Sequence, residues 1–271
     1  MVNHVPVNLQ EALELRAEQN LIPYAGGTDL MVENRKNAEY LFLNRVRELK
    51  EIREDEDCIR IGAAVTFTES LENELVPAIM KDAVARIASP AIRNAGTFGG
   101  NLGNGSAKAD TVTIEYAADA KVRLVSLRGE RIVDVDRFCL GRKTIDLRPD
   151  ELIAEILLPK NGLENYYYEK VGGREALAIS RVSFAGIFQE ENGRIKKLTA
   201  AFGAVSDTVL RFRDLEGMLE GKTTAEARTM RDKFLDAYDR RMTLTAGRVS
   251  AEYRKTVCLN LLGAFLEQYG I

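Results

Sequence analysis

The stretch that decides the fold of this chain has the sequence IRNAGTFGGNLGNGS (residues 92–106). Five glycines and three asparagines occur in it, beside the apolar Ile92, Phe98 and Leu102. Glycine loses much backbone entropy on ordering, so such a segment becomes ordered only where something holds it. A diphosphate, which accepts hydrogen bonds from many backbone N–H groups, is a natural candidate. The alternative is a flexible surface loop, although flexible linkers favour Ser and Lys over large apolar residues.

A second glycine-containing loop, YAGGTDL (residues 24–30), follows a short apolar run at residues 21–25. This pattern predicts a strand, a tight turn and a helix that begins at Thr28, with Thr28 and Asp29 as capping types. Adjacent glycines let backbone N–H groups approach an anion, and a helix start would favour negative charge there. The alternative is a plain strand–turn–helix connection. The chain has no GxxxxGK[ST] motif and the first loop lacks GxGxxG spacing, so the pair predicts another kind of dinucleotide cradle.

The rest of the chain predicts two α+β regions that divide at residues 159–165, where the composition shifts. Before this boundary, we expect helices at 8–19, 69–87 (interrupted near Pro77) and 110–117, and strands at 21–25, 40–44, 59–64, 121–127, 131–135 and 152–158. After it, we expect strands at 166–171, 180–189 and 195–205, followed by helices from residue 209 to the end. The pair Asn192-Gly193 predicts a hairpin between the last two strands.

Composition excludes several classes of function. The 38 basic and 41 acidic residues give a net charge of −3, which offers no footprint for nucleic acid or an anionic membrane surface. No apolar run reaches the roughly 18–20 residues that span a bilayer. The first ten residues lack the basic and apolar regions of a signal peptide, so we expect a cytoplasmic protein.

Histidine and cysteine usage narrows the chemistry further. His4 is the only histidine, and Cys58, Cys139 and Cys258 lie far apart without a CxxC pair. A Ser-His-Asp triad, a histidine metal site and a cysteine-ligated cluster are therefore not expected. We expect no catalytic side chain and no metal in this chain, so any redox chemistry would come from a bound organic cofactor.

The two loops resemble the FAD-binding loops of the flavoprotein (medium) subunits of the molybdenum hydroxylases, the family of xanthine dehydrogenase and carbon monoxide dehydrogenase. The resemblance continues in order through LRPDELI (147–153), KVGGR (170–174), Ile179-Ser180, FGAV (202–205) and Tyr253-Arg254. It implies an α+β fold with a two-lobed PCMH-type FAD-binding domain at residues 1–160, its lobes spanning about 1–55 and 56–160. A C-terminal domain of the CO dehydrogenase flavoprotein type, with a three-stranded antiparallel sheet and a helical bundle, would span 161–271.

The resemblance also implies which residues hold the cofactor, mostly through backbone N–H groups in the two loops. These residues are Pro23, Tyr24, Ala25, Gly26, Gly27, Thr28, Asp29 and Leu30 in the first loop, Thr97, Phe98, Gly99, Gly100 and Asn101 in the second, and Ile87, Asp110, Ile153 and Lys170 elsewhere. Plain alternatives exist for three of them, since Asp110 could cap a helix, Ile153 could be core and Lys170 could be a solvated strand residue.

The chain departs from the family pattern in two places. Ile87 stands where some members stack a phenylalanine on the flavin ring, and Ala107 stands where the family usually has a proline. An alanine at residue 107 frees the backbone torsion φ and adds an N–H donor, so we expect a local adjustment rather than loss of FAD.

The function implied by the resemblance is that of the FAD-carrying electron-transfer subunit of a xanthine dehydrogenase-like enzyme. A large molybdopterin subunit and a small 2Fe–2S subunit would complete the hetero-oligomer, with NAD or another molecule as electron acceptor. The alternatives are the same role in an aldehyde, nicotinate, carbon monoxide or aromatic-CoA enzyme, a nucleotide-binding module without redox turnover, and a structural subunit that has lost its cofactor. The intact glycine pairs argue against the last two.

Overall fold

The computed structural model describes residues 3–33, 37–174 and 177–271, which form two compact units. Unit 1 consists of the chain up to Val76, Ile87–Ser106 and Asp119–Lys160. Unit 2 consists of Pro77–Arg86, Ala107–Ala118 and Asn161–Ile271. Neither unit is continuous in sequence, because two short segments before residue 160 belong to unit 2. The division into domains at residue 160, and the two lobes before it, stay predictions.

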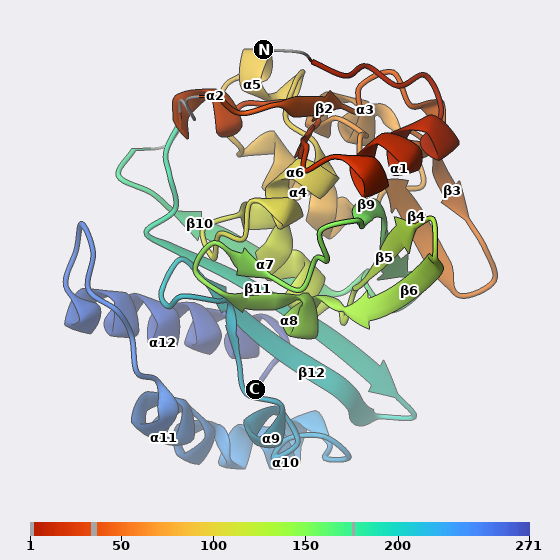
Figure 1. Cartoon of the computed structure of the whole chain (residues 1–271). Helices are drawn as coiled ribbons and strands as arrows, with labels where there is room; N and C mark the ends of the chain where they lie inside the picture. Colours follow the sequence, from red (N-terminus) through yellow and green to blue (C-terminus); the bar gives the residue numbers. More distant parts are fainter. Residues whose placement is uncertain (1–2, 34–36, 175–176) are drawn as a thin grey trace. The chain divides into compact units, whose positions relative to one another are not determined.

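A five-stranded sheet in the order β3-β4-β9-β5-β6 is the framework of unit 1 (Figure 1). All its neighbouring strands are antiparallel, and their bounds are Ile52–Glu54 (β3), Cys58–Gly62 (β4), Leu152–Pro159 (β9), Lys121–Ser126 (β5) and Gly129–Asp134 (β6). The central strand β9 is buried from Leu152 to Leu158. The positions predicted for β4, β5, β6 and β9 are confirmed to within two residues.

The buried carboxylate of Glu155 on β9 is balanced by arginines from the strands β3, β4 and β5. Its oxygens accept from Arg53 at 2.7 Å, Arg60 at 3.3 Å and Arg123 at 3.2 Å. Burial of a charge is costly unless it is paired and hydrogen-bonded, and here three guanidinium groups supply those partners. The network therefore lets an acidic residue occupy the middle of the sheet.

Smaller elements surround the sheet of unit 1. They are α1 (Leu9–Glu18), β1 (Ile22–Tyr24), α2 (Leu30–Glu33), β2 (Tyr40–Phe42), η1 (Arg47–Leu49), α3 (Phe67–Glu72), α5 (Pro90–Arg93), α6 (Phe98–Gly103), α8 (Val135–Phe138), β7 (Cys139–Gly141) and β8 (Thr144–Ile145). The predicted helix at 8–19 is confirmed as α1, whose N-cap Asn8 accepts from the Glu11 N–H. The strands β1 and β2 pair in parallel, and β7 and β8 form a hairpin.

Two sequence-based expectations in unit 1 were wrong. The helix expected to begin at Thr28 begins at Leu30, since residues 28 and 29 form a turn. The segment expected to be a glycine-rich loop contains the helix α6, capped by Thr97, whose hydroxyl accepts from the Gly100 N–H. The burial of Phe98 and Leu102 anchors this helix and outweighs the low helix propensity of its glycines.

Unit 2 is built on an antiparallel sheet in the order β10-β11-β12-β13. Its strands are Tyr166–Val171 (β10), Val182–Glu191 (β11), Arg194–Gly203 (β12) and Leu210–Arg211 (β13). The three longer strands were predicted, whereas the two-residue β13 falls in a segment predicted to be helical. Asn192 and Gly193 both have positive φ (54° and 74°), as the predicted tight hairpin requires.

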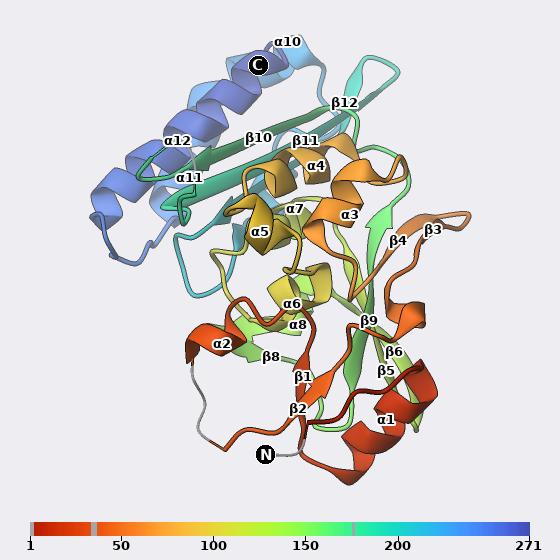
Figure 2. The same ribbon diagram turned by 90° about the horizontal axis from the view of Figure 1, so that it is seen from above.

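Helices cover both faces of this sheet (Figure 2). The helices α4 (Ala78–Ala85) and α7 (Asp110–Ala117) pack on one face, and α12 (Ala251–Gln268) packs on β11 from the other. The remaining helices are α9 (Arg213–Glu216), α10 (Thr224–Thr229) and α11 (Arg231–Arg241). Since both faces are covered, seven consecutive residues of β11 from Val182 are buried. The predicted helix 69–87 is divided at Pro77 into α3 and α4.

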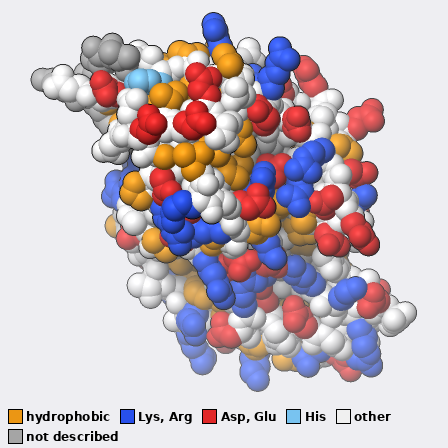
Figure 3. All heavy atoms as spheres, turned by 45° about the vertical axis from the view of Figure 1, so that its right-hand side comes forward, with side chains coloured by type: hydrophobic (Ala, Val, Ile, Leu, Met, Phe, Trp, Pro, Cys, Tyr) orange, Lys and Arg blue, Asp and Glu red, His pale blue; other side chains and the backbone are white. Residues whose placement is uncertain are grey.

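The surface agrees with the small net charge. The face shown in Figure 3 carries both acidic and basic side chains. Among the described residues, no helix has both the length and the apolar composition needed to cross a membrane.

Candidate functional site

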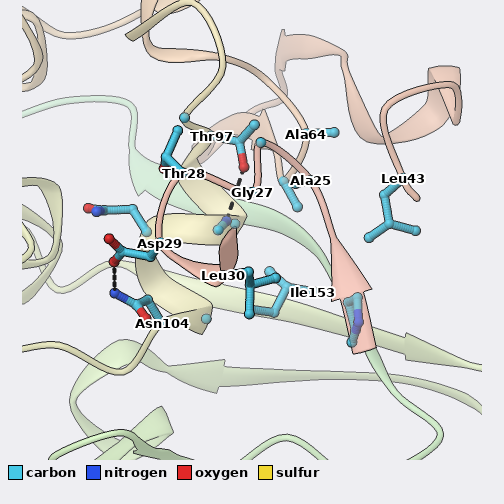
Figure 4. Close-up of a pocket in the computed structure, with 18 of the residues that line it drawn as sticks. Ala25, Gly27, Thr28, Asp29, Leu30, Leu43, Ala64, Thr97, Asn104 and Ile153 are labelled. Atoms are coloured by element: carbon cyan, nitrogen blue, oxygen red, sulfur yellow. Dashed lines mark hydrogen bonds between the residues drawn. The ribbon is translucent and has the colours of Figure 1, made fainter. Parts of the chain in front are cut away.

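The two glycine-containing loops meet at one cavity of about 330 Å³ in unit 1. The first loop follows β1 and the second contains α6, and the end of β9 closes the cavity with Ile153 (Figure 4). The volume lies within the range of roughly 300–1,000 Å³ that is usual for small-molecule sites. Both loops singled out in the sequence therefore contribute to the same site, although about 70 residues separate them.

Glycine is required in the first loop for two separate reasons. A Cβ atom on Gly26 would lie 1.8 Å from the carbonyl oxygen of Ala95, so no side chain fits where the two loops cross. Gly27 has φ +68°, the left-handed conformation that other residues adopt at a cost. The backbone turns here as sharply as the sequence predicted.

The first loop presents unpaired backbone donors. Within the part of the chain that the structure describes, the N–H groups of residues 25–29 have no hydrogen-bond partner. These residues line the cavity. Backbone N–H groups in folded proteins are almost always paired with protein, water or ligand. The loop is therefore suited to hydrogen-bond an anionic ligand.

The second loop differs, because most of its N–H groups are already engaged. Those of Phe98 and Gly99 donate to the carbonyls of Val65 (3.2 Å) and Ala63 (2.9 Å). Those of Gly100 and Asn101 donate to the side chain and carbonyl of Thr97. Among the predicted residues of this loop, only the Thr97 N–H has no partner within the described residues, so the expectation that this loop acts mainly through N–H groups stays a prediction that rests on fewer donors than in the first loop.

The shape of the second loop depends on two glycines with different surroundings. A Cβ on Gly99 would lie 2.5 Å from the Cβ of Ala63, so this glycine permits helix α6 to pack on the chain after β4. A Cβ on Gly100 would meet only the Thr97 hydroxyl within 4 Å, at 3.0 Å, and Gly100 is exposed and lines the cavity. The absence of a side chain at Gly100 therefore keeps the cavity open.

Polar side chains that the sequence did not single out close one end of the cavity. The amide of Asn104 donates to the carboxylate of Asp29 (Figure 4). The carbonyl oxygen of Asn104 accepts from the Lys143 ammonium. The Lys143 ammonium also lies 3.3 Å from the carboxylate of Glu33. No motif in the sequence marked Lys143, because it lies in an ordinary hairpin turn between β7 and β8.

The cavity brings together most of the predicted loop residues and one residue from outside the loops. The predicted residues that line it are Pro23, Ala25, Gly26, Gly27, Thr28, Asp29, Leu30, Thr97, Gly99, Gly100, Asn101 and Ile153. The Tyr24 ring instead packs 4.5 Å from the ring of Phe42, and the Phe98 side chain is buried against Phe67. Ile87 is half-buried, and its carbonyl accepts from Arg93 at 2.7 Å. These three residues do not line the cavity, and the cofactor-binding role of every predicted residue stays a prediction.

Asp110 and Lys170 form a buried ion pair within unit 2. The Lys170 ammonium donates to Asp110 at 2.7 Å and to the Arg86 carbonyl at 2.9 Å, and Ser180 donates to the other Asp110 oxygen at 2.5 Å. Both charged side chains are only 7% exposed. Burial raises the pKa of Asp110, and its two partners oppose that rise. The N-cap of α7 is Ala109, so the alternative that Asp110 merely caps this helix is not supported.

The described residues include three cysteines and many acidic side chains, which are common ligands of metal ions. Among them, no group of three or more His, Cys, Asp or Glu side chains is arranged to hold a metal. The three cysteines are free thiols, and burial raises the pKa of Cys258 to about 12, which keeps it unreactive.

Comparison with known families assigns almost the whole chain. Residues 2–161 match the model of the FAD binding domain in molybdopterin dehydrogenase. Residues 166–269 match the model of the CO dehydrogenase flavoprotein C-terminal domain.

Individual relatives agree with both family models. The xanthine dehydrogenase FAD-binding subunit of Escherichia coli O157:H7 is 32% identical over 225 residues, covering 79% of this chain and 77% of the relative. The nicotinate dehydrogenase FAD-subunit of Eubacterium barkeri is 32% identical over 234 residues, covering 80% and 78%. A chain of carbon monoxide dehydrogenase from Hydrogenophaga pseudoflava superposes with a TM-score of 0.89 at 25% identity, covering 98% and 95%.

Proposed function

The chain belongs to the FAD-binding subunits of the xanthine and carbon monoxide dehydrogenase type of molybdenum hydroxylases, and we propose that it is the electron-transfer subunit of a xanthine dehydrogenase-like complex. In this proposal, electrons arrive from 2Fe–2S clusters of a small subunit and leave to NAD or another acceptor. A large molybdopterin subunit hydroxylates the substrate. The relatives named for xanthine dehydrogenase support this assignment.

The observation that carries the proposal is the fit between the cavity and a dinucleotide. The first loop offers the unpaired N–H groups of residues 25–29, and Gly100 lines the cavity without a side chain. A pyrophosphate accepts several hydrogen bonds and needs close approach to the backbone, which both features allow. The residues present therefore suit the phosphate-bearing part of FAD.

FAD, when bound, supplies the electron-accepting and electron-donating chemistry, while the protein binds and orients it. The first loop would donate its N–H groups to the phosphates. The second loop would lie flat against the ligand because Gly100 has no side chain. Ile153, only 8% exposed, would form an apolar wall that excludes water.

The Asp110–Lys170 pair is proposed to act on the flavin through one remaining donor. An ammonium has three N–H groups, and those of Lys170 donate to Asp110 and to the Arg86 carbonyl, which leaves one. Because two bonds fix the lysine, the third N–H has a defined direction. Such a group holds a positive charge in a fixed position within unit 2.

An absorption spectrum of the purified chain, followed by chromatography of the cofactor released by acid, tests the proposal. We expect the two visible bands of an oxidised flavin and the release of FAD rather than FMN. A colourless chain that also takes up no added FAD would contradict the proposed function.

The partners and the substrate need the complex itself. We expect affinity purification from the native host to recover a large molybdenum-containing and a small iron–sulfur subunit, and the complex to reduce NAD with xanthine. Because one relative is a nicotinate dehydrogenase FAD-subunit, nicotinate is the first alternative substrate to compare. Reduction of an artificial dye but not of NAD would contradict the proposed acceptor.

A further inference from the structure

Lys143 is held at the end of the cavity by the same glycine-rich segment that lines it. Its backbone N–H donates to the Gly105 carbonyl at 2.7 Å, and a Cβ on Gly105 would come within 3.1 Å of the Lys143 Cα. Lys143 itself has φ +59° at the turn of the β7–β8 hairpin. The hairpin and the loop are thus packed backbone to backbone, which directs the lysine toward the cavity.

The charges on the described lining residues give this lysine a role in binding an anionic ligand. Among the described residues that line it, the charged side chains are Asp29, Glu33 and Lys143, so two negative charges face one positive charge. A phosphate entering beside two carboxylates is repelled unless a cation is close. Asn104 bonds both Asp29 and Lys143, and it thereby fixes one carboxylate while aligning the lysine.

The contact between Lys143 and Glu33 can be exchanged for another anion. The two atoms lie 3.3 Å apart, and the side chains are 49% and 30% exposed. An ion pair of such exposure contributes little to stability, so its replacement by a phosphate costs little. A phosphate also accepts stronger charge-assisted hydrogen bonds than a solvated pair provides.

We propose that Lys143 is the phosphate-binding cation of the cavity and that Glu33 competes with the ligand for it. This inference rests on the proposed function, since the ligand is the FAD pyrophosphate. It assigns a binding role to a residue outside both glycine-rich loops. It also predicts effects of opposite sign for the two partners of one ion pair.

The test is the affinity of the apo chain for FAD, measured by quenching of flavin fluorescence in EDTA at several salt concentrations. Lys143→Met should weaken binding about 10- to 100-fold, as expected for loss of a charge-assisted hydrogen bond. In this variant, the affinity for FAD should also depend less on salt concentration. Lys143→Arg should keep most of the wild-type affinity because it keeps the positive charge. Glu33→Gln should strengthen binding several-fold by removing the competitor.

The matched control is Lys196→Met, which removes a lysine of similar exposure (55%) that pairs with Glu191 at 2.9 Å. It should leave the affinity for FAD unchanged. Wild-type affinity in Lys143→Met would overturn the inference. The inference would also be overturned if Glu33→Gln weakened FAD binding as much as Lys143→Met does, because the ion pair would then only stabilise the structure around the cavity. A wild-type chain that binds no FAD would instead overturn the proposed function and this inference with it.

Discussion

The buried carboxyl group of Glu115 makes the stability of the chain depend on pH. Glu115 lies on α7, every residue of which is buried, and its side chain is fully buried. Neither of its oxygens makes a well-formed hydrogen bond within the described residues. Burial raises the pKa of Glu115 to about 8, with Thr111, one helical turn earlier, acting in the opposite direction.

The size of the effect follows from the difference in pKa between the folded and unfolded chain. The pKa of Glu115 is about 8 in the folded chain and 4.5 in the unfolded chain. Between these two pH values, the folded chain keeps a proton that the unfolded chain has lost. The contribution is therefore complete below pH 4.5 and is lost as the pH rises through 8, at about 1.4 kcal/mol per pH unit. Between pH 5 and pH 8, Glu115 should lower the free energy of unfolding by roughly 3–4 kcal/mol.

Urea unfolding of the wild type and Glu115→Gln at pH 5, 6, 7 and 8 tests this prediction. Because glutamine does not titrate, the variant should gain stability relative to the wild type as the pH rises. The exposed Glu56 serves as the control, since Glu56→Gln changes the net charge equally without burial. A stability difference between wild type and Glu115→Gln that stays constant from pH 5 to pH 8 would refute the reasoning.

Three further predictions follow from the site and the sheet. Gly100→Val adds a branched side chain at a residue that lines the cavity, so it should lower the FAD content of the purified chain at least tenfold with little change in unfolding free energy. Gly99→Val should instead overpack the core and lower the unfolding free energy by about 1–3 kcal/mol. FAD retained at the wild-type level in Gly100→Val would contradict the cradle. Lys170→Ala should shift the absorption spectrum or reduction potential of the bound flavin, and an unchanged flavin would leave the lysine a purely structural partner of Asp110. Glu155→Gln should lower the unfolding free energy by about 1–3 kcal/mol, a range that allows for solvent screening of the three partly exposed arginines. Added salt should weaken these ion pairs in the wild type, so the difference in stability between wild type and variant should shrink as the salt concentration rises.

Much of the fold could be predicted from local sequence. The hairpin at Asn192-Gly193 needs two residues with positive φ, and this pair adopts that conformation readily. Strands such as β9 and β11 are marked by apolar runs bounded by turn residues. The helix α6 could not be predicted, because packing of Phe98 and Leu102 outweighed the propensity of the glycines around them.

Only those parts of the candidate site that depend on backbone conformation could be predicted from the sequence. The pairs Gly26-Gly27 and Gly99-Gly100 signalled close approach and sharp turning, both of which are local properties. Lys143 escaped notice, because its role depends on Glu33, which lies 110 residues away in sequence. The identity of the family came from two short loops and the order of motifs after them.

The sequence by itself determined where several turns fall and which segments form most of the longer strands and helices, and it predicted that two glycine-rich loops bind a ligand. These properties depend on torsion preferences and on apolar spacing within a few residues. Only the tertiary structure decided that the described residues leave the N–H groups of residues 25–29 unpaired while most of those in the second loop are engaged, and that the carboxyl group of Glu115 is fully buried. Such features depend on which distant segments come together, and burial then sets the cost of each charge and each unpaired donor.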